Sequence, residues 1–429
     1  MRATRRDLMI GGSAAAAALA IGATPKVMAQ DKTKITWWHI NTIDAEAAAF
    51  QALADAFVAE NPNVEIEITV LENEAFKQKI ATAMQSGEPP DIFQSWGGGV
   101  LFEYADAGLV KDIAADLATD GWGDTFLPAA LELYGQDGQY YGVPWRTGMV
   151  TFWYNKALFE QAGIEAPPAT WAEFLTTVQT LKDAGITPIT VGEGDKWPGH
   201  FYWVYLAIRE GGKAAFDAAY DRSGSFADPP FVEAGARLKE LIDLEPFQTG
   251  FLGATYNEAA AVIANGEAAI ELMGHWGPSV QKDESESGEG LGEDLGIFTF
   301  PMVEGGAGNP SDVLGGGDGY AVGINASPEA IAFVKFLTSP ENQATLAAEG
   351  LAVPPAVESA ASEIADPLQQ EIAQMAAAAE YLQLFYDQYL PPAVGGVVND
   401  SVQELFAGTA SPEDVAQAIE DSFASESGA

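Results

Sequence analysis

The chain has 429 residues, of which 62 are acidic and 20 basic, giving a formal net charge of −42 at neutral pH. This balance disfavours a nucleic-acid partner, because phosphate binding requires clustered lysine and arginine. The chain contains no cysteine, so we expect neither disulfide bonds nor a cysteine-linked lipid anchor. The acidic residues are spread along the sequence, which is typical of a solvated surface in a salty medium. Such a surface also suits a cationic ligand such as a polyamine.

Residues 1–29 have the features of an export signal. They contain the twin-arginine pair Arg5-Arg6, an apolar, alanine-rich run at 8–23, and the small-residue cleavage pattern Val27-Met28-Ala29. The apolar run is shorter than the roughly 20 residues that a membrane-spanning helix needs. We therefore expect a twin-arginine signal peptide that is removed before Gln30, and a soluble periplasmic protein.

The next residues alternate between strand and helix patterns. Residues 34–40 have strand character, 44–61 have helical spacing, and 64–70 alternate apolar with polar side chains as in a half-solvated strand. A second helical pattern covers 76–84, and a short apolar strand pattern begins at 92–93. This order predicts an α/β fold with a parallel sheet covered by helices.

Loops at the carboxyl ends of parallel strands form the ligand crevice of such sheets. This rule places residues 39–44, 72–73 and 95–99 on one rim. Three glycines follow the tryptophan in the last of these loops, which favours close approach of the backbone to a ligand. Each of these residues also has an alternative interpretation: Trp96 suits core packing, and the polar residues suit helix caps or solvent-exposed positions. The rim candidates for ligand binding are His39, Asn41, Asp44, Glu72, Trp96 and Gly98.

Further along the chain, residues 140–148 interrupt the alternation and lead into a strand pattern at 150–154. Thr170 and Glu173 form a capping box at the start of a helix. The glycine-rich residues 315–319 precede another strand pattern, and later helices begin with Ser-Pro pairs. About 400 residues follow the signal, which is enough for two hydrophobic cores, since single cores stop growing near 250–300 residues.

Six motifs in this order resemble the extracellular solute-binding proteins of bacterial ABC sugar importers, solute-binding protein family 1, which includes maltose-binding protein. The resemblance covers nearly all of the chain after the signal. The motifs are Glu-Pro-Pro-Asp-Ile-Phe (88–93), Tyr-Gly-Val-Pro (141–144) with Trp-Tyr-Asn-Lys (153–156), Ala-Thr-Trp-Ala-Glu-Phe (169–174), Gly-Glu-Ala-Ala-Ile (266–270) with Trp276, Phe-Val-Lys-Phe-Leu-Thr-Ser-Pro-Glu-Asn (333–342) and Phe-Ala-Gly-Thr-Ala-Ser-Pro-Glu-Asp (406–414).

The resemblance implies the type II periplasmic-binding-protein fold, in which two α/β lobes close on a ligand around a hinge of several chain crossings. The glycine-rich second crossing suits a backbone that absorbs dihedral change. The implied division gives an N-terminal lobe of residues 30–143 plus about 320–365, a C-terminal lobe of about 148–314 plus 368–429, and hinge crossings near 144–148, 315–319 and 365–368.

A sugar has apolar C–H faces ringed by hydroxyls, so its site needs aromatic platforms and a few fixed polar groups. Trp96 and Trp276 match positions at which the family stacks sugar. Trp197 and His200 lie close together beside proline and glycine and join the candidate set.

The hinge crossings supply the remaining candidates. Arg146 lies at the first crossing, where the family often places a sugar-binding side chain, although an arginine there equally suits a hinge salt bridge. Gly317 and Asp318 lie at the second crossing, where the aspartate also suits a simple turn. Trp153 and Trp171 match core positions.

The resemblance implies the substrate-binding component of an ABC transporter, a monomer that captures an oligosaccharide and delivers it to membrane permease subunits. It implies no cofactor, no metal and no catalysis. The same fold binding a polyamine is one alternative. A glycoside-active enzyme is another, because it needs only two placed carboxylates. However, no Ser/His/Asp set stands out, and the three histidines lack metal-binding spacing.

Overall fold

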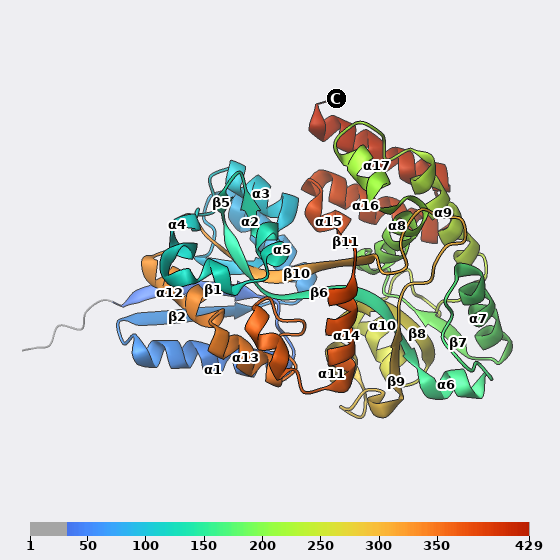
Figure 1. Ribbon diagram of the computed structural model, residues 1–429, viewed down its shortest axis with the longest axis horizontal. Coiled ribbons are helices and arrows are strands. Elements are labelled where there is room, and N and C mark those ends of the chain that lie inside the picture. Colours follow the sequence, from blue (N-terminus) through green and yellow to red (C-terminus); the bar gives the residue numbers. More distant parts are fainter. Residues whose placement is uncertain (1–31, 429) are drawn as a thin grey trace, which may run out of the picture.

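The computed structural model describes residues 32–428, and the predicted export signal lies outside them. Two halves lie side by side, and strands β6 (Gly142–Asn155) and β10 (Val313–Val322) run from one into the other (Figure 1). These strands pair antiparallel, with Gly315 opposite Met149 and Ala321 opposite Gly142. The predicted interruption at 140–148 is therefore wrong from Gly142 onwards, and residues 315–319, expected as a glycine-rich segment before a strand, are themselves part of strand β10. Each segment continues a strand because it satisfies the other's backbone hydrogen bonds.

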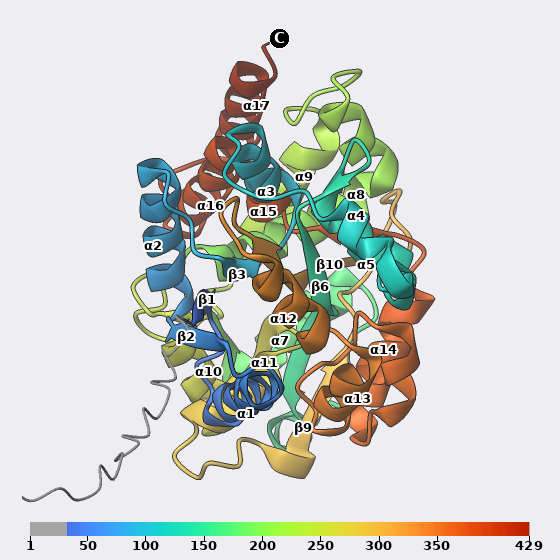
Figure 2. The ribbon, with the colours of Figure 1, turned by 90° about the vertical axis from the view of Figure 1, so that its left-hand side faces the viewer.

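The first half contains the parallel sheet that the sequence predicts. Strand β1 (Thr33–His39) pairs in parallel with both β2 (Val64–Val70) and β3 (Ile92–Ser95), and β3 pairs antiparallel with β10. Helices α1 (Asp44–Glu60) and α2 (Asn73–Ser86) lie on opposite sides of these strands (Figure 2).

Shorter elements complete this half. They are α3 (Gly98–Asp106), α4 (Ala114–Leu117), η1 (Thr119–Gly121), η2 (Gly123–Thr125), α5 (Pro128–Leu131), η3 (Glu132–Tyr134), the hairpin β4 (Gly135–Gln136) and β5 (Gln139–Tyr140), α12 (Pro328–Leu337), α13 (Pro340–Ala348) and η5 (Glu358–Glu363).

The second half continues the same nine-stranded sheet. Strand β6 pairs antiparallel with β8 (Ala268–Gly274) and β9 (Leu295–Phe298), and β8 pairs in parallel with β7 (Thr187–Thr190). Strand β11 (Leu382–Leu384) pairs with β10. The helices of this half are α6 (Lys156–Gln161), α7 (Trp171–Asp183), α8 (Trp197–Tyr220), α9 (Pro229–Ile242), α10 (Tyr256–Ala264), α11 (Gly277–Glu284), η4 (Gly292–Asp294), α14 (Pro367–Ala378), α15 (Tyr386–Tyr389), α16 (Pro392–Phe406) and α17 (Pro412–Ser427).

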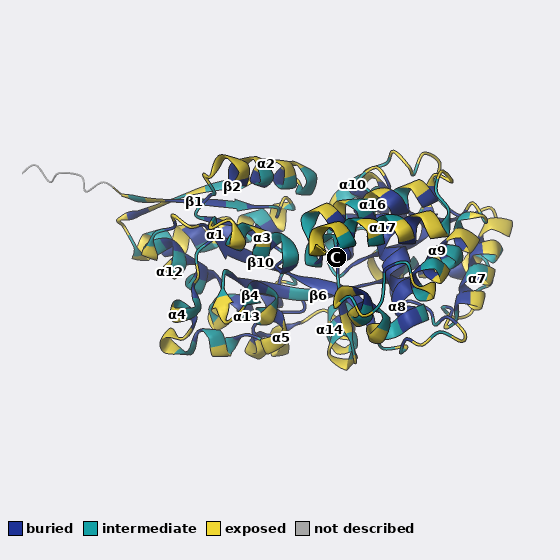
Figure 3. Ribbon diagram, turned by 90° about the horizontal axis from the view of Figure 1, so that it is seen from above, coloured by how far each residue is buried: buried dark blue, intermediate teal, exposed yellow. Residues whose placement is uncertain are grey.

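Each half has its own hydrophobic core. The first is built around Trp37, which packs edge-on against Phe50 of α1 and Phe333 of α12. The second is built around Phe152, which stacks on Phe298 and Phe300. Figure 3 shows the long strands β6 and β10 buried at the centre of the sheet and the surrounding helices exposed on their outer faces. No helix in residues 32–428 has the length and apolar character needed to cross a membrane.

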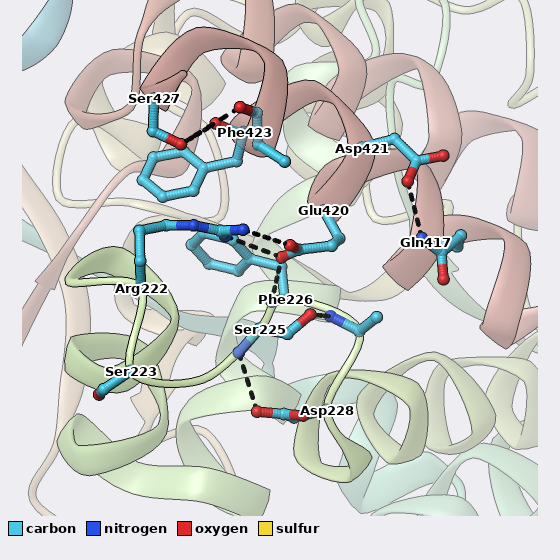
Figure 4. A network of polar contacts seen from close by, with 12 residues as sticks. Arg222, Ser223, Ser225, Phe226, Asp228, Gln417, Glu420, Asp421, Phe423 and Ser427 are labelled. Carbon is cyan, nitrogen blue, oxygen red and sulfur yellow. Dashed lines mark hydrogen bonds and ion pairs between the residues drawn. The ribbon is translucent and has the colours of Figure 1, made fainter. Parts of the chain in front are cut away.

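An ion pair between Arg222 and Glu420 connects helix α17 to the loop that follows α8 (Figure 4). Arg222 donates two hydrogen bonds to the carboxylate of Glu420, at 3.1 and 2.7 Å, and Phe226 N donates a third at 2.8 Å. These hydrogen bonds, chiefly those from Arg222, lower the pKa of Glu420. Its ionised form therefore stabilises the fold at neutral pH, and this contribution is lost as the pH falls through the folded-state pKa.

Replacing Glu420 by glutamine removes this pH-dependent contribution. We expect Glu420→Gln to lower the free energy of unfolding by about 1 kcal/mol at neutral pH, and by less at about pH 3, where a larger fraction of wild-type Glu420 is protonated. Urea titrations at both pH values measure the difference. An equal loss at the two pH values would contradict this account.

A buried carboxyl group gives the second half the opposite pH response. Glu193 is fully buried near the start of α8, and burial raises its pKa to about 8 from an ordinary value of 4.5. The folded state therefore holds a proton that the unfolded state releases between these pH values, so stability falls as the pH rises through that window.

Glutamine at this position cannot titrate. We expect the Tm of the wild type to fall more steeply between about pH 5 and pH 8 than that of Glu193→Gln. Thermal melts followed by circular dichroism measure the two slopes, with the exposed Glu426→Gln as the matched control. If Tm falls equally steeply with pH in the wild type and in Glu193→Gln, then Glu193 is not the source of this pH dependence.

Candidate functional site

A solvent-open pocket with an empty volume of about 930 Å³ lies between the two halves. The first half contributes the loop after β1, the start of α2 and the residue after β3. The second half contributes the starts of α8, α10 and α11 and the segment around α15. The lining residues are Ile40, Asn41, Thr42, Ile43, Glu46, Glu72, Asn73, Lys77, Trp96, Arg146, Trp197, Phe201, Tyr256, Asn257, Trp276, Val280, Phe385, Asp318, Asp387 and Gln388.

Aromatic rings form much of the pocket wall. The Trp197 ring lies 5.1 Å from that of Tyr256 and 6.4 Å from that of Trp276, and Trp276 in turn lies 6.3 Å from Phe385. On the opposite wall, Trp96 packs edge-on against Phe76 at 6.0 Å. The pocket therefore presents aromatic surface from both halves.

A glycine positions one of these rings, and a helix start positions another. The Trp276 indole lies over Gly274, where a side chain would occupy the same space, so the strand end at β8 must be glycine for the ring to adopt this position. Trp197 is the first residue of α8, and Pro198 follows it in the first turn, where a missing N–H costs nothing.

A buried network of charges forms the polar part of the pocket. The register of the paired strands places Arg146 of β6 opposite Asp318 of β10, and Arg146 Nε donates to Asp318 Oδ2 at 2.6 Å. Arg146 Nη1 donates to Glu46 Oε1 at 3.0 Å and to the Leu351 carbonyl at 3.2 Å. Interaction with the two carboxylates raises the pKa of Arg146 despite its burial. Arg146 therefore forms a salt bridge between strands β6 and β10 and also lines the pocket.

Two amide side chains extend this network. Asn41 Nδ2 donates to Glu46 Oε2 at 2.8 Å, and Gln94 Nε2 donates to Asp318 Oδ1 at 3.0 Å. Each buried carboxylate thus receives hydrogen bonds from an amide as well as from Arg146. These bonds fix the side chains in one geometry before any ligand arrives.

The pocket brings together seven of the twelve residues that the sequence predicts. Glu72 has a second role, since its carboxylate caps α2 by accepting from Glu74 N at 3.0 Å and Ala75 N at 3.4 Å. The seven residues are Asn41, Glu72, Trp96, Arg146, Trp197, Trp276 and Asp318.

Two predicted histidines lie in the core instead of in the pocket lining. The His39 ring packs against Trp37 at 4.7 Å, and burial lowers its pKa to about 4, so it is neutral at physiological pH. His200 is fully buried in α8, with Nε2 at 3.9 Å from Asp387 Oδ1, and burial lowers its pKa. Asp44 begins α1 and is exposed outside the lining.

The two predicted glycines also lie outside the lining. Gly98 packs against α15, where a β-carbon would lie 2.9 Å from the Gln388 carbonyl oxygen. Gly98 and Gly99 therefore allow the backbones of the two halves to approach closely, and Gly97 packs against Leu133 within the first half. Gly317 lies in β10, and its carbonyl accepts a long hydrogen bond of 3.5 Å from the Tyr134 hydroxyl.

Several lining residues were not predicted from the sequence. Phe201 lies one helical turn after Trp197, so its position on the same face follows from the i, i+4 spacing. Tyr256 and Asn257 begin α10, directly after the capping box formed by Thr255 and Glu258. Nothing in the local sequence around α15 signals that Phe385, Asp387 and Gln388 reach the pocket.

A second, larger pocket of about 1400 Å³ adjoins the first. The two share Lys77, Trp96, Asp387 and Gln388, so they form one continuous cleft along the boundary between the halves. Among residues 32–428, no group of three or more His, Asp or Glu side chains is arranged to hold a metal ion.

Residues 42–344 match the family model described as bacterial extracellular solute-binding protein. Among curated proteins, a probable sugar-binding periplasmic protein of Mesorhizobium japonicum is 26% identical over 318 residues, covering 72% of each chain.

Two solved structures are also similar over most of the chain. One comes from work on xylan utilization by the thermophilic bacterium Caldanaerobius polysaccharolyticus; it is 29% identical, with a TM-score of 0.85, and the match covers 91% of this chain and 99% of that one. The other is a chitin oligosaccharide binding protein, 28% identical, with a TM-score of 0.83 and coverage of 91% and 98%.

Proposed function

Because the chain belongs to the bacterial extracellular solute-binding protein family, we propose that it captures an oligosaccharide in the cleft and delivers it to the permease of an ABC importer. The similar proteins named above are a sugar-binding protein and an oligosaccharide-binding protein, which supports this substrate class. They are binding proteins, which supports a role without catalysis.

The arrangement of aromatic rings around a fixed polar network is the observation that carries the proposal. Trp96 from one half and Trp276 from the other offer flat apolar surfaces to the C–H faces of a sugar. Arg146 uses three of its five N–H donors within the protein, and the two on Nη2 have no acceptor among the described residues. They are available to a sugar hydroxyl.

Titration of the mature protein, from Gln30, tests the proposal. Intrinsic tryptophan fluorescence is recorded against mono- and oligosaccharides and against spermidine. Saturable binding of one sugar class at micromolar or lower Kd, without product formation, supports the proposed function. Binding of spermidine and of no sugar would overturn the substrate class and keep the fold.

In the proposed binding cycle, the two lobes move relative to each other, and each keeps its own hydrophobic core intact. The N-terminal lobe would comprise residues 30–143 and about 320–365, and the C-terminal lobe about 148–314 and 368–429. Bending near 144–148, 315–319 and 365–368 would close the cleft around the sugar. Closure excludes water and strengthens the polar contacts to the ligand.

We also propose export through the twin-arginine route and action as a periplasmic monomer. Conservative replacement of both arginines, Arg5→Lys with Arg6→Lys, keeps the charge but removes the paired guanidinium groups that the route recognises. We expect the precursor to accumulate in the cytoplasm. Cell fractionation and immunoblotting measure this, and unchanged periplasmic recovery of the double variant would exclude the route.

A further inference from the structure

Three amide side chains along the cleft are oriented in the same way. Asn41 donates its NH₂ group to Glu46, Gln94 to Asp318, and Asn399 Nδ2 to Asp387 Oδ2 at 3.4 Å. A carboxylate only accepts hydrogen bonds, so these contacts fix which end of each amide is nitrogen.

The same three amides leave their carbonyl oxygens without a donor. The side-chain oxygens of Asn41, Gln94 and Asn399 are buried, and no described residue donates to them. Asn41 and Gln94 are each 2% exposed, so they have little alternative access to solvent. Asn41 lines the first pocket, and the other two line the second. A ligand group that reaches these oxygens must therefore be a hydrogen-bond donor.

The charges of the cleft point to the same ligand chemistry. Each of its three cations already contacts a carboxylate: Arg146 as described above, Lys77 with Glu74 at 2.8 Å, and Lys196 with Asp400 at 2.6 Å. The remaining carboxylates of the lining have no Lys or Arg partner among the described residues. These are Glu72, Asp195 and Asp387.

An acidic ligand would meet mostly unfavourable groups here, apart from the two N–H groups on Arg146 Nη2, and the charge of Arg146 is already balanced by Glu46 and Asp318. The ligand's carboxylate would lose water, face acceptors that cannot donate, and lie near unpaired carboxylates of the same sign. Hydroxyl and amino groups would instead satisfy the free carbonyl oxygens. From these contacts, and resting on the proposed function, we infer that the cleft selects neutral or amino-bearing sugar chains and rejects chains that carry a uronate.

Matched ligands test this selectivity by calorimetry at 0.15 M and 1 M NaCl. Cellotetraose, xylotetraose and chitotetraose are each compared with a counterpart that carries one uronate unit. For the neutral sugar that binds, we expect a Kd at least about tenfold lower than that of its uronate counterpart. Much of the ratio between the two Kd values should persist at 1 M NaCl, because the half-buried carboxylates Asp195 and Asp387 are screened less than fully exposed surface charges.

Two near-isosteric variants identify the groups responsible. Asp387→Asn and Asp195→Asn each remove one negative charge from the cleft. Each should lower the ratio of the Kd of the uronate-bearing chain to that of the neutral chain by roughly threefold or more. The matched control Asp421→Asn removes a charge from exposed helix α17 and should leave the ratio unchanged.

The outcomes separate this inference from the proposed function. Equal affinity for neutral and uronate-bearing chains would overturn the inference while leaving sugar binding intact. A preference that disappears at 1 M NaCl and is unaffected by the cleft variants would also overturn it, since general surface charge would then be the cause. Failure of every sugar to bind would instead overturn the proposed function together with the inference.

Discussion

Replacement of Arg146 by methionine is expected to lower the free energy of unfolding by about 3–5 kcal/mol, because it leaves two buried carboxylates without their cation. Arg146, Asp318 and Glu46 are each less than a tenth exposed. Methionine fills similar volume but supplies none of the three hydrogen bonds that Arg146 donates. Chemical denaturation at neutral pH measures the loss.

A compensated variant shows whether charge is the cause. Combining Arg146→Met with Glu46→Gln and Asp318→Asn removes the uncompensated charges and should recover much of the lost stability, as replacement of a whole buried charge cluster often does. Arg146→Lys keeps the charge but lacks the planar donor arrangement, so it should lie between wild type and Arg146→Met. A triple variant no more stable than the single one would attribute the loss to packing.

Replacement of Trp276 by alanine is expected to raise the Kd for the bound sugar roughly thirtyfold or more, a loss of about 2 kcal/mol. The indole lies among Trp197, Phe385 and His275 at the pocket wall, so truncation removes a large apolar surface from the ligand. Calorimetry measures the affinity, because the substitution also removes a fluorophore.

Two controls accompany this substitution. Trp276→Phe keeps a flat ring and should retain more affinity than Trp276→Ala. Trp38→Ala removes a tryptophan in the first half that Lys79 covers and that lies outside the pocket lining. It should leave the Kd unchanged. Equal losses from Trp38→Ala and Trp276→Ala would show a general effect on folding.

Local patterns in the sequence predicted individual elements of both halves well. Helix α1 begins at Asp44 as its spacing indicates, and the capping box of Thr170 and Glu173 forms at the start of α7. Such features depend on neighbours a few residues away, which the sequence displays directly. Trp153 and Trp171 are core residues, as predicted.

The sequence was less informative where distant segments decide the structure. Gly315–Gly319 has the composition of a loop, yet it forms a strand because β6 pairs with it along its whole length. His39 and Gly98 lie at the ends of strands that form the rim, but their surroundings depend on distant residues: the His39 ring packs against Phe50, and the backbone of Gly98 packs against α15. Asp387 reaches the cleft only through contacts made far from it in the sequence.

The long strands that cross between the halves also constrain how the chain acquires its structure during synthesis. Trp37 packs against Phe333 in the first core, although 296 residues separate them in the sequence. Strand β10, which completes that half's sheet, is likewise translated after most of the second half. Neither core can therefore close on the ribosome as a self-contained N-terminal unit. Contacts this distant in sequence make folding slow. The native state therefore forms only when nearly the whole polypeptide has been made.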